Sequence, residues 1–362
     1  MFLAKHHYAI ELAKRGNTVY FLNPPDQTSI SFKDSIEVSE SEYKNLFLIK
    51  HRLFFPYWLK FKAFLAFHWL MSFHITELMK TIGKIDIVWS FDIGNLYPLG
   101  IFKNAYKIFH PVDEPLTKEA ILSAAHAQII LSVTKEILSK YENYDAPKYL
   151  IGHGVSPEFI SPTDAQEYVS HTPLQIGLSG NLMRPDIDRE TLIKIITENK
   201  DIVFHFWGSF RSKDSNIGGA EDASTQSFIA SLEKLRNVKL HGSVDTKTLA
   251  SAIRNLDGFL ICYDVQKDQS RGTNYHKVLE YLAVGKVIIS NNITSYHDAP
   301  DLVQMVNERN NNISLPALFR SITDSLSIHN SQVLMQKRIK FAAENTYKFK
   351  IDQIQKWLEG KV

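Results

Sequence analysis

Lys277 and Glu280 are the two side chains of this sequence best placed to do chemistry together. The segment around them has helical spacing, so both side chains share one helical face, with Thr273 one turn earlier. A lysine suits a pyrophosphate as a point charge, and a carboxylate accepts two hydrogen bonds from a vicinal diol such as a ribose. Spacing alone favours a simpler interpretation, because an i, i+3 surface pair stabilises a helix by about 0.2–0.5 kcal/mol and needs no ligand.

The pair belongs to a helix–turn–strand unit. Val278 and Leu282 lie on the apolar side of the helix, and Gly285 stands where a left-handed helix cap is expected. Residues 287–289 are a short β-branched run typical of a buried strand. Strands alternate with helices along the whole chain, which predicts an α/β protein with doubly wound parallel sheets.

The 362 residues predict two such domains facing a central cleft, because the alternation restarts at comparable length. We expect an N-terminal, acceptor-side domain over residues 1–155 and a polar linker over 156–172. Residues 173–335 form the predicted nucleotide-sugar-binding domain, and 336–362 the C-terminal helices. The last of these helices is expected to cross back to the first domain.

Composition narrows the class of protein. The formal net charge is +2, so charge does not indicate a nucleic-acid partner. The single cysteine, Cys262, excludes an internal disulfide and a cysteine-based zinc site, which fits a cytoplasmic protein. Neither a signal-peptide pattern nor an uncharged apolar run of about 18 residues is present, so no membrane span is predicted.

A glycine turn follows the first predicted strand of the second domain. Gly180 and Asn181 come directly after strand 174–179, at an edge where doubly wound sheets bind ligands. A glycine there lets backbone N–H groups approach a phosphate. One glycine alone is more often an ordinary turn.

The segment from Lys277 to Ser290, KVLEYLAVGKVIIS, resembles the nucleotide-binding signature of GT-B glycosyltransferases similar to the retaining family 4. The resemblance implies the GT-B fold and transfer of a hexose from a nucleotide diphosphate-sugar to a glycan or lipid-linked acceptor, in surface polysaccharide biosynthesis. It implies a retaining mechanism that needs neither a metal nor another cofactor. Further segments resemble the family in the same order: residues 6–19, 151–155, 176–182 with 186–188, and 257–263.

The resemblance also implies residue roles. Glu280 would hold the ribose hydroxyls, and Lys277 the pyrophosphate. The helix start expected near Thr273 and Asn274 would hold the pyrophosphate as well. The other donor-binding positions would be Gly180 and Asn181 at the pyrophosphate and Gly242 and Ser243 along the base, with His110 or Asp113 as catalytic groups facing the sugar or acceptor.

The sequence departs from the family pattern at several positions. Gly272 stands where the retaining enzymes carry a second glutamate, and Asn181 and Asp186 replace an arginine and a lysine. A strand expected before Phe2 is missing. The departures leave open a non-catalytic nucleotide- or glycan-binding relative, or a nucleotide-sugar epimerase on the same fold. The missing charge could come from any of four cations: Arg184, Arg189, Lys267 and Arg271.

An aromatic segment at residues 54–73 allows two interpretations. Apolar residues at positions 54, 58, 61, 65, 69 and 73 form a helical stripe, with Lys60 and Lys62 interleaved. The stripe could dock on an anionic membrane, at the inner face of the plasma membrane, near a lipid-linked acceptor. Because core packing is the commoner use of such stripes, we expect instead a core helix of the first domain.

Overall fold

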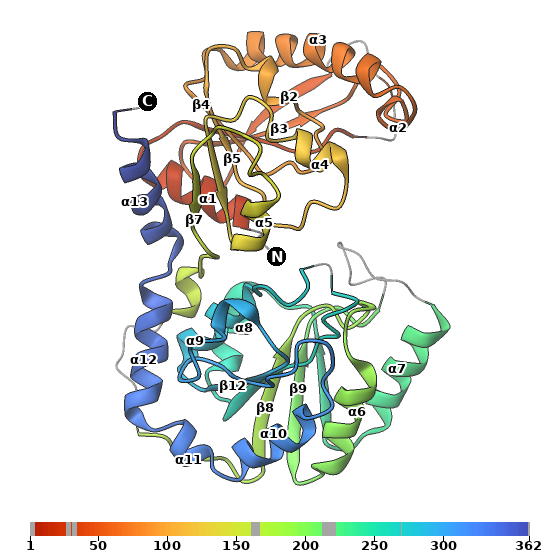
Figure 1. The fold of residues 1–362 in the computed structure, drawn as a ribbon, viewed down its shortest axis with the longest axis vertical. Helices are drawn as coiled ribbons and strands as arrows, with labels where there is room; N and C mark the ends of the chain where they lie inside the picture. Colours follow the sequence, from red (N-terminus) through yellow and green to blue (C-terminus); the bar gives the residue numbers. More distant parts are fainter. Residues whose placement is uncertain are drawn as a thin grey trace. The chain divides into compact units, whose positions relative to one another are not determined.

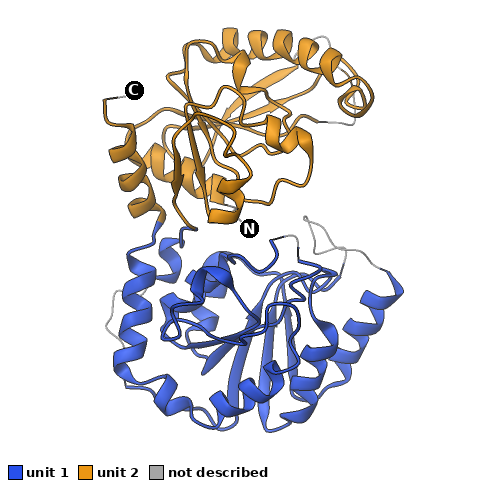
Figure 2. Cartoon of the chain, viewed as in Figure 1, with its two compact units in different colours: residues 1, 153–346 blue, residues 2–152, 347–362 orange. Residues whose placement is uncertain are grey.

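The computed structural model describes residues 4–26, 30, 35–160, 167–211, 222–268 and 270–360 (Figure 1). The chain divides into two compact units (Figure 2). Unit 1 contains residues 153–346, and unit 2 contains residues 2–152 and 347–362. The chain therefore leaves unit 2 after Gly152 and returns to it at Tyr347.

Unit 1 is built on one six-stranded sheet whose strands are all parallel. The strand order is β10-β9-β8-β11-β12-β13. Winding therefore starts at β8, proceeds to β10, and reverses at the β8–β11 boundary, which is the point where doubly wound sheets bind ligands. The strands are β8 (Leu174–Ser179), β9 (Ile202–Trp207), β10 (Val238–Gly242), β11 (Gly258–Ile261), β12 (Val287–Ser290) and β13 (Gln304–Met305).

Helices cover this sheet, and aspartates begin several of them. Asp188, Asp222 and Asp245 each accept a backbone N–H from the first turn of the following helix. The helices are α6 (Arg189–Glu198), α7 (Ala223–Lys234), α8 (Thr246–Ile253), α9 (Lys277–Val284), α10 (Leu315–Thr323), α11 (Leu326–His329) and α12 (Gln332–Ala343).

The described residues of the segment predicted as a linker pack within unit 1. Pro157–Phe159 form a short 3-10 helix, and the buried Phe159 packs into the core of unit 1. The Tyr168 hydroxyl donates to a carboxylate oxygen of Asp257 at 2.9 Å. The same buried carboxylate accepts the backbone N–H of Gln175 at 2.7 Å, so it fixes the start of β8.

Unit 2 distributes its strands over two sheets. One has the order β1-β3-β2, and the other is the parallel sheet β4-β5-β6-β7. Strand β2 runs antiparallel to β3. Its alternation of apolar and polar residues is only five residues long and ends among charged side chains. The strands are β1 (Val19–Leu22), β2 (Ile36–Glu40), β3 (Leu46–His51), β4 (Ile87–Ser90), β5 (Tyr106–Phe109), β6 (Ile129–Ser132) and β7 (Lys148–Leu150).

The first and last helices that the structure describes pack together in unit 2. Arg15, just after α1 (Ala4–Lys14), forms an ion pair with Asp352 of α13 (Tyr347–Leu358) at 2.7 Å. The Trp357 ring stacks on Tyr149 with ring centroids 4.3 Å apart. Unit 2 also contains α2 (Leu59–Lys62), α3 (Phe64–Ile82), α4 (Lys118–Leu122) and α5 (Lys135–Ser139).

The aromatic segment forms α2 and α3, which are separated by the non-helical backbone of Ala63. Helix α3 faces the core of unit 2 with Phe67, Met71, Ile75 and Leu78, each at most 2% exposed. The stripe predicted through positions 54, 58, 61, 65, 69 and 73 packs against the core only at the half-buried Phe54. For the other five positions the expectation of core packing is wrong, because these side chains are exposed. Helix α3 is apolar around most of its circumference, so helical spacing fits two different apolar faces and does not show which of them is buried.

Candidate functional site

Three neighbouring strands of unit 1 end in glycines with positive φ. These are Gly180 after β8, Gly208 after β9 and Gly242 at the end of β10, with φ of +144°, +132° and +73°. A Cβ added to Gly208 would lie only 1.9 Å from the carbonyl oxygen of Gly180, so no side chain fits. The carboxyl edge of the sheet therefore presents bare backbone. Gly208 was missed from the sequence, although it follows its strand just as Gly180 does.

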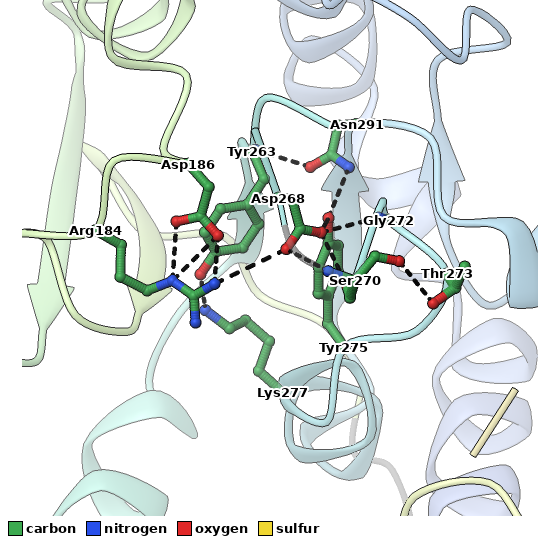
Figure 3. Close-up of polar contacts among 10 residues, drawn as sticks. All are labelled: Arg184, Asp186, Tyr263, Asp268, Ser270, Gly272, Thr273, Tyr275, Lys277 and Asn291. Atoms are coloured by element: carbon green, nitrogen blue, oxygen red, sulfur yellow. Dashed lines mark hydrogen bonds and ion pairs between the residues drawn. The ribbon is translucent and has the colours of Figure 1, made fainter. Parts of the chain in front are cut away.

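Lys277 reaches this edge from the first turn of α9. Its side chain is 6% exposed, and its ammonium donates to the Ser179 carbonyl and the Tyr263 hydroxyl, both at 2.5 Å. A Cβ on Gly180 would lie 2.7 Å from the Lys277 Nζ atom. Lys277 thus fills the switch point between β8 and β11 (Figure 3), and it is not a surface residue.

The charge of Lys277 survives its burial. Burial alone lowers the pKa of the ammonium, but the adjacent Tyr263 and Tyr281 hydroxyls and the Glu280 carboxylate more than offset this, so the pKa is raised. A buried cation in low dielectric attracts an anion more strongly than an exposed one does.

Glu280 lies one turn along α9 and is half-buried. Burial raises the pKa of its carboxyl to about 7, and the nearby Lys277 opposes the shift. In the parts of the chain that the structure describes, no hydrogen bond or ion pair reaches this carboxylate. Its oxygens can therefore accept hydrogen bonds from a ligand.

Arg184 adds a second cation beside Lys277. Its guanidinium Nε donates to both carboxylate oxygens of Asp186, at 2.8 and 3.1 Å, and a terminal nitrogen lies 3.8 Å from Asp268 (Figure 3). Both carboxylates are buried, whereas the Arg184 side chain is 47% exposed. Hydrogen bonding to Asp186 raises the pKa of Arg184. The network fixes the cation while leaving part of it accessible.

The other cations that the sequence left open lie elsewhere. Arg189 donates to the hydroxyls of Ser224 and Thr225 on α7. Lys267 forms an ion pair with Asp264 at 3.0 Å, and Arg271 is exposed. Arg184 is therefore the cation of the four that joins Lys277. Its partnership with Asp268 joins residues 84 positions apart, which no local pattern could reveal.

The loop before α9 is organised by Asp268. Its carboxylate accepts the Gly272 backbone N–H at 2.9 Å, the Ser270 hydroxyl at 2.6 Å and the Tyr275 hydroxyl at 2.8 Å. Gly272 has φ +63°, and a Cβ there would lie 2.8 Å from the Asn292 carbonyl oxygen. The position that carries a glutamate in the retaining family thus has no room for a side chain in this loop.

The remaining predicted donor positions surround this centre. The helix start expected near Thr273 and Asn274 is wrong, because α9 begins at Lys277 and the Thr273 hydroxyl donates to the Ser270 carbonyl at 2.8 Å. Asn181 accepts the Met183 backbone N–H at 2.9 Å, which fixes the turn after β8. Gly242 and Ser243 lie two strands away, at the end of β10.

The two catalytic candidates belong to unit 2. His110 follows β5 and is fully buried, where Trp89 Nε1 donates to its Nδ1 at 3.3 Å and Phe91 stacks on it at 4.8 Å. Asp113 lies three residues further on and is exposed. Their catalytic roles stay predictions. Among the described residues, no three metal-ligating side chains gather into a group.

No protein-family model and no curated protein matches the sequence. Solved structures do match the fold. Sucrose-phosphate synthase from Thermosynechococcus elongatus aligns at TM-score 0.67 and 12% identity, over 98% of this chain and 92% of that one. The UDP-forming α,α-trehalose-phosphate synthase from Burkholderia xenovorans, in complex with glucose-6-phosphate, aligns at TM-score 0.67 and 10% identity. The alignment covers 98% of this chain and 96% of that one. HepE from Anabaena, in complex with UDP and glucose, aligns at TM-score 0.59 and 11% identity, over 87% of this chain and 86% of that one.

The chain has the GT-B fold. This confirms the predicted fold class, while the low identities mean that the likeness concerns backbone topology and says little of individual side chains. In this GT-B chain, the switch point of unit 1 holds Lys277, Arg184 and the bare backbone of Gly180, with Glu280 one helical turn away. The arrangement can bind an anion beside a group that donates hydrogen bonds.

Proposed function

We propose that this protein is a glycosyltransferase that moves a sugar from a nucleotide diphosphate-sugar to a glycan or lipid-linked acceptor. The observation that supports it most is the buried Lys277 ammonium, aimed at the bare backbone of Gly180, with the Glu280 carboxylate on the same helix. A diphosphate would lie against the ammonium, and a ribose diol would donate to the carboxylate. HepE, which has the same fold, holds UDP and glucose in its solved structure.

In the proposed reaction, the bond between the anomeric carbon and the diphosphate breaks, and its electron pair stays on the leaving oxygen. Lys277 and the accessible part of Arg184 would stabilise that developing charge. They are held in place by Tyr263, Asp186 and Asp268 before the substrate arrives, so little reorganisation is needed. These cations would supply the charge that other enzymes take from a metal, and we propose a metal-independent reaction on that ground.

Retention of the anomeric configuration and a role in surface polysaccharide synthesis in the cytoplasm are proposed from the resemblance of residues 277–290 to the retaining family. Gly272 favours a second candidate, a non-catalytic nucleotide-binding relative, because its tight surroundings leave no room for the glutamate of that family. Both candidates share the donor site and differ only in turnover.

A panel of nucleotide sugars tests the proposal. We expect one donor to release its nucleoside diphosphate, slowly in water and faster with a glycan or lipid-linked acceptor. Binding of nucleoside diphosphate without release from any donor would favour the non-catalytic relative. If calorimetry detects no binding of any nucleoside diphosphate or nucleotide sugar, the donor site itself is refuted.

A further inference from the structure

We infer that an exposed apolar face of α2 and α3 docks unit 2 on the surface of an anionic lipid bilayer. We call this face the aromatic ridge. Its five side chains are Trp58, Phe61, Leu65, Trp69 and Phe73. The inference does not depend on the proposed reaction, since docking can be measured without donor or acceptor.

The ridge is defined by exposure and by spacing. Its side chains are 55%, 76%, 84%, 63% and 49% exposed, in chain order. Leu65, Trp69 and Phe73 recur every fourth residue, so they follow one another along α3. Trp58 and Phe61 lie at the start of α2 and within it, and α2 contacts α3 near the beginning of α3 (Figure 1). Single exposed apolar side chains are ordinary, but a continuous row marks an interaction surface.

The core of unit 2 does not need these side chains. Helix α3 turns Phe67, Met71 and Ile75 inward, where they pack with residues of β3 and of the segment after it. The inner and outer faces of one helix are thus both apolar, and only the inner one is covered. Packing in the core explains the apolar side chains of the inner face, but it does not explain those of the aromatic ridge on the outer face.

The charge around the ridge favours an anionic bilayer as its occupant. Residues 53–76 contain Lys60 and Lys62 and no aspartate or glutamate. Lys62 is exposed, and the Lys60 ammonium lies 5.9 Å from the Phe61 ring. Asp92 lies near Lys60, but its carboxylate is engaged by the backbone N–H groups of its own loop at 2.5 to 3.0 Å. Lysines beside aromatic rings match anionic headgroups above an acyl boundary.

The side-chain chemistry indicates shallow insertion. Tryptophan prefers the headgroup level, and phenylalanine and leucine enter the acyl boundary. No helix in the described ranges is long and apolar enough to cross a membrane. At its far end, the ridge stops at the exposed ion pair of Glu77 and Lys80, 2.6 Å apart. The helix would therefore lie along the surface.

Vesicle co-flotation of the full chain tests the inference. We expect it to float with vesicles of phosphatidylglycerol and phosphatidylcholine, and much less with phosphatidylcholine alone. The double variant Leu65→Ser/Trp69→Ser should lower the partition coefficient at least tenfold. Lys60→Gln/Lys62→Gln should remove the preference for anionic vesicles. A matched control, Ile328→Ser/Val333→Ser, removes two side chains of unit 1 that are 68% and 75% exposed and should float like the unaltered protein.

Two further measurements check that the variants fold and whether a second copy of the chain, in place of a bilayer, covers the aromatic ridge. Because the altered side chains are exposed, apart from the half-buried Lys60, all variants should keep the melting temperature and circular dichroism of the unaltered protein. Absence of flotation with anionic vesicles would overturn the inference, as would undiminished flotation of the Leu65→Ser/Trp69→Ser variant. A protein that does not float but is a dimer by light scattering, and becomes a monomer with the same two changes, would identify a second copy as the occupant.

Discussion

The two units use the same alternation of strand and helix to build opposite kinds of surface. In unit 1, a single parallel sheet gathers buried charges at its switch point, where Lys277, Asp186 and Asp268 are each at most 6% exposed. In unit 2, the end of β5 places His110 among aromatic rings, and α3 exposes apolar side chains. The fold thus supplies the positions, and the side chains decide which unit meets a charged ligand.

The two units should also differ in how strongly substitutions affect their stability and binding. A buried charge whose partner is removed leaves an uncompensated charge in low dielectric, so unit 1 should respond strongly to single substitutions at its switch point. Exposed apolar side chains contribute little to folding, so unit 2 should accept changes at the aromatic ridge.

Replacing Lys277 should have the largest effect on binding. Lys277→Met keeps the aliphatic stem but removes the buried ammonium that faces Gly180. We expect affinity for a nucleoside diphosphate to fall about 100-fold, or about 3 kcal/mol, by titration calorimetry. Lys340→Met makes the same change at a side chain that is 77% exposed and should leave affinity unaltered. Equal affinities of the two variants would remove unit 1 as the anion site.

A methyl group at Gly180 should weaken the site from the backbone side. Gly180→Ala would place Cβ 2.7 Å from the Lys277 Nζ atom at a φ of +144°. We expect a stability loss of about 1–3 kcal/mol in chemical denaturation and about a tenfold loss of nucleotide affinity.

Gly16→Ala provides the control for Gly180→Ala. Gly16 also has a positive φ (+89°), but an added Cβ would meet no atom within 4 Å. This substitution in unit 2 should lower stability through backbone strain and leave nucleotide affinity unchanged. If Gly180→Ala behaves in the same way, the close approach of Lys277 to Gly180 has no role in binding.

Affinity for a nucleotide sugar should rise with pH because of Glu280. Its raised pKa of about 7 leaves the carboxyl mostly protonated at pH 6 and mostly ionised at pH 8, and a ribose diol donates best to the ionised form. We expect about a tenfold gain in affinity between these pH values. A nucleotide sugar is the suitable ligand, because its pyrophosphate diester does not titrate in this range. Glu280→Gln should flatten the profile; the same slope in that variant would assign the effect to another group.

Replacing Arg184 should have the smallest effect of the changes at the switch point of unit 1. Arg184→Gln leaves the buried carboxylates of Asp186 and Asp268 without their cation. Because solvent screens the half-exposed guanidinium, we expect a loss of about 1–2 kcal/mol in denaturant unfolding at pH 7. The double variant with Asp268→Asn should lose less than the sum of the single changes. Lys80→Gln, at an exposed ion pair of unit 2, should change stability by less than about 0.5 kcal/mol. A larger loss at Lys80 than at Arg184 would reverse the contrast between the units.

The sequence predicted what local spacing controls. Strand β8 has the predicted limits, and the helix with Lys277, Glu280 and the capping Gly285 is present as α9. Helical spacing also placed the Lys277 and Glu280 side chains on one helix face, but it could not show that Lys277 is buried. That burial depends on Ser179 and Tyr263, which come from other elements.

Long-range contacts explain most of what was missed. The ion pair of Arg184 with Asp268 and the close approach of Gly208 to Gly180 join separate loops, and neither leaves a pattern in the local sequence. The prediction of which face of α3 is buried was wrong for a different reason. Both of its faces are apolar, and only the packing of β3 and the residues after it against Phe67 and Met71 decides which one is buried.

A structure of the full chain bound to a nucleoside diphosphate tests the central claim most directly. We expect a diphosphate against the Lys277 ammonium and the Gly180 backbone, with both ribose hydroxyls donating to the Glu280 carboxylate. A nucleotide bound at any other part of the chain, or one at this edge whose ribose points away from Glu280, would contradict it.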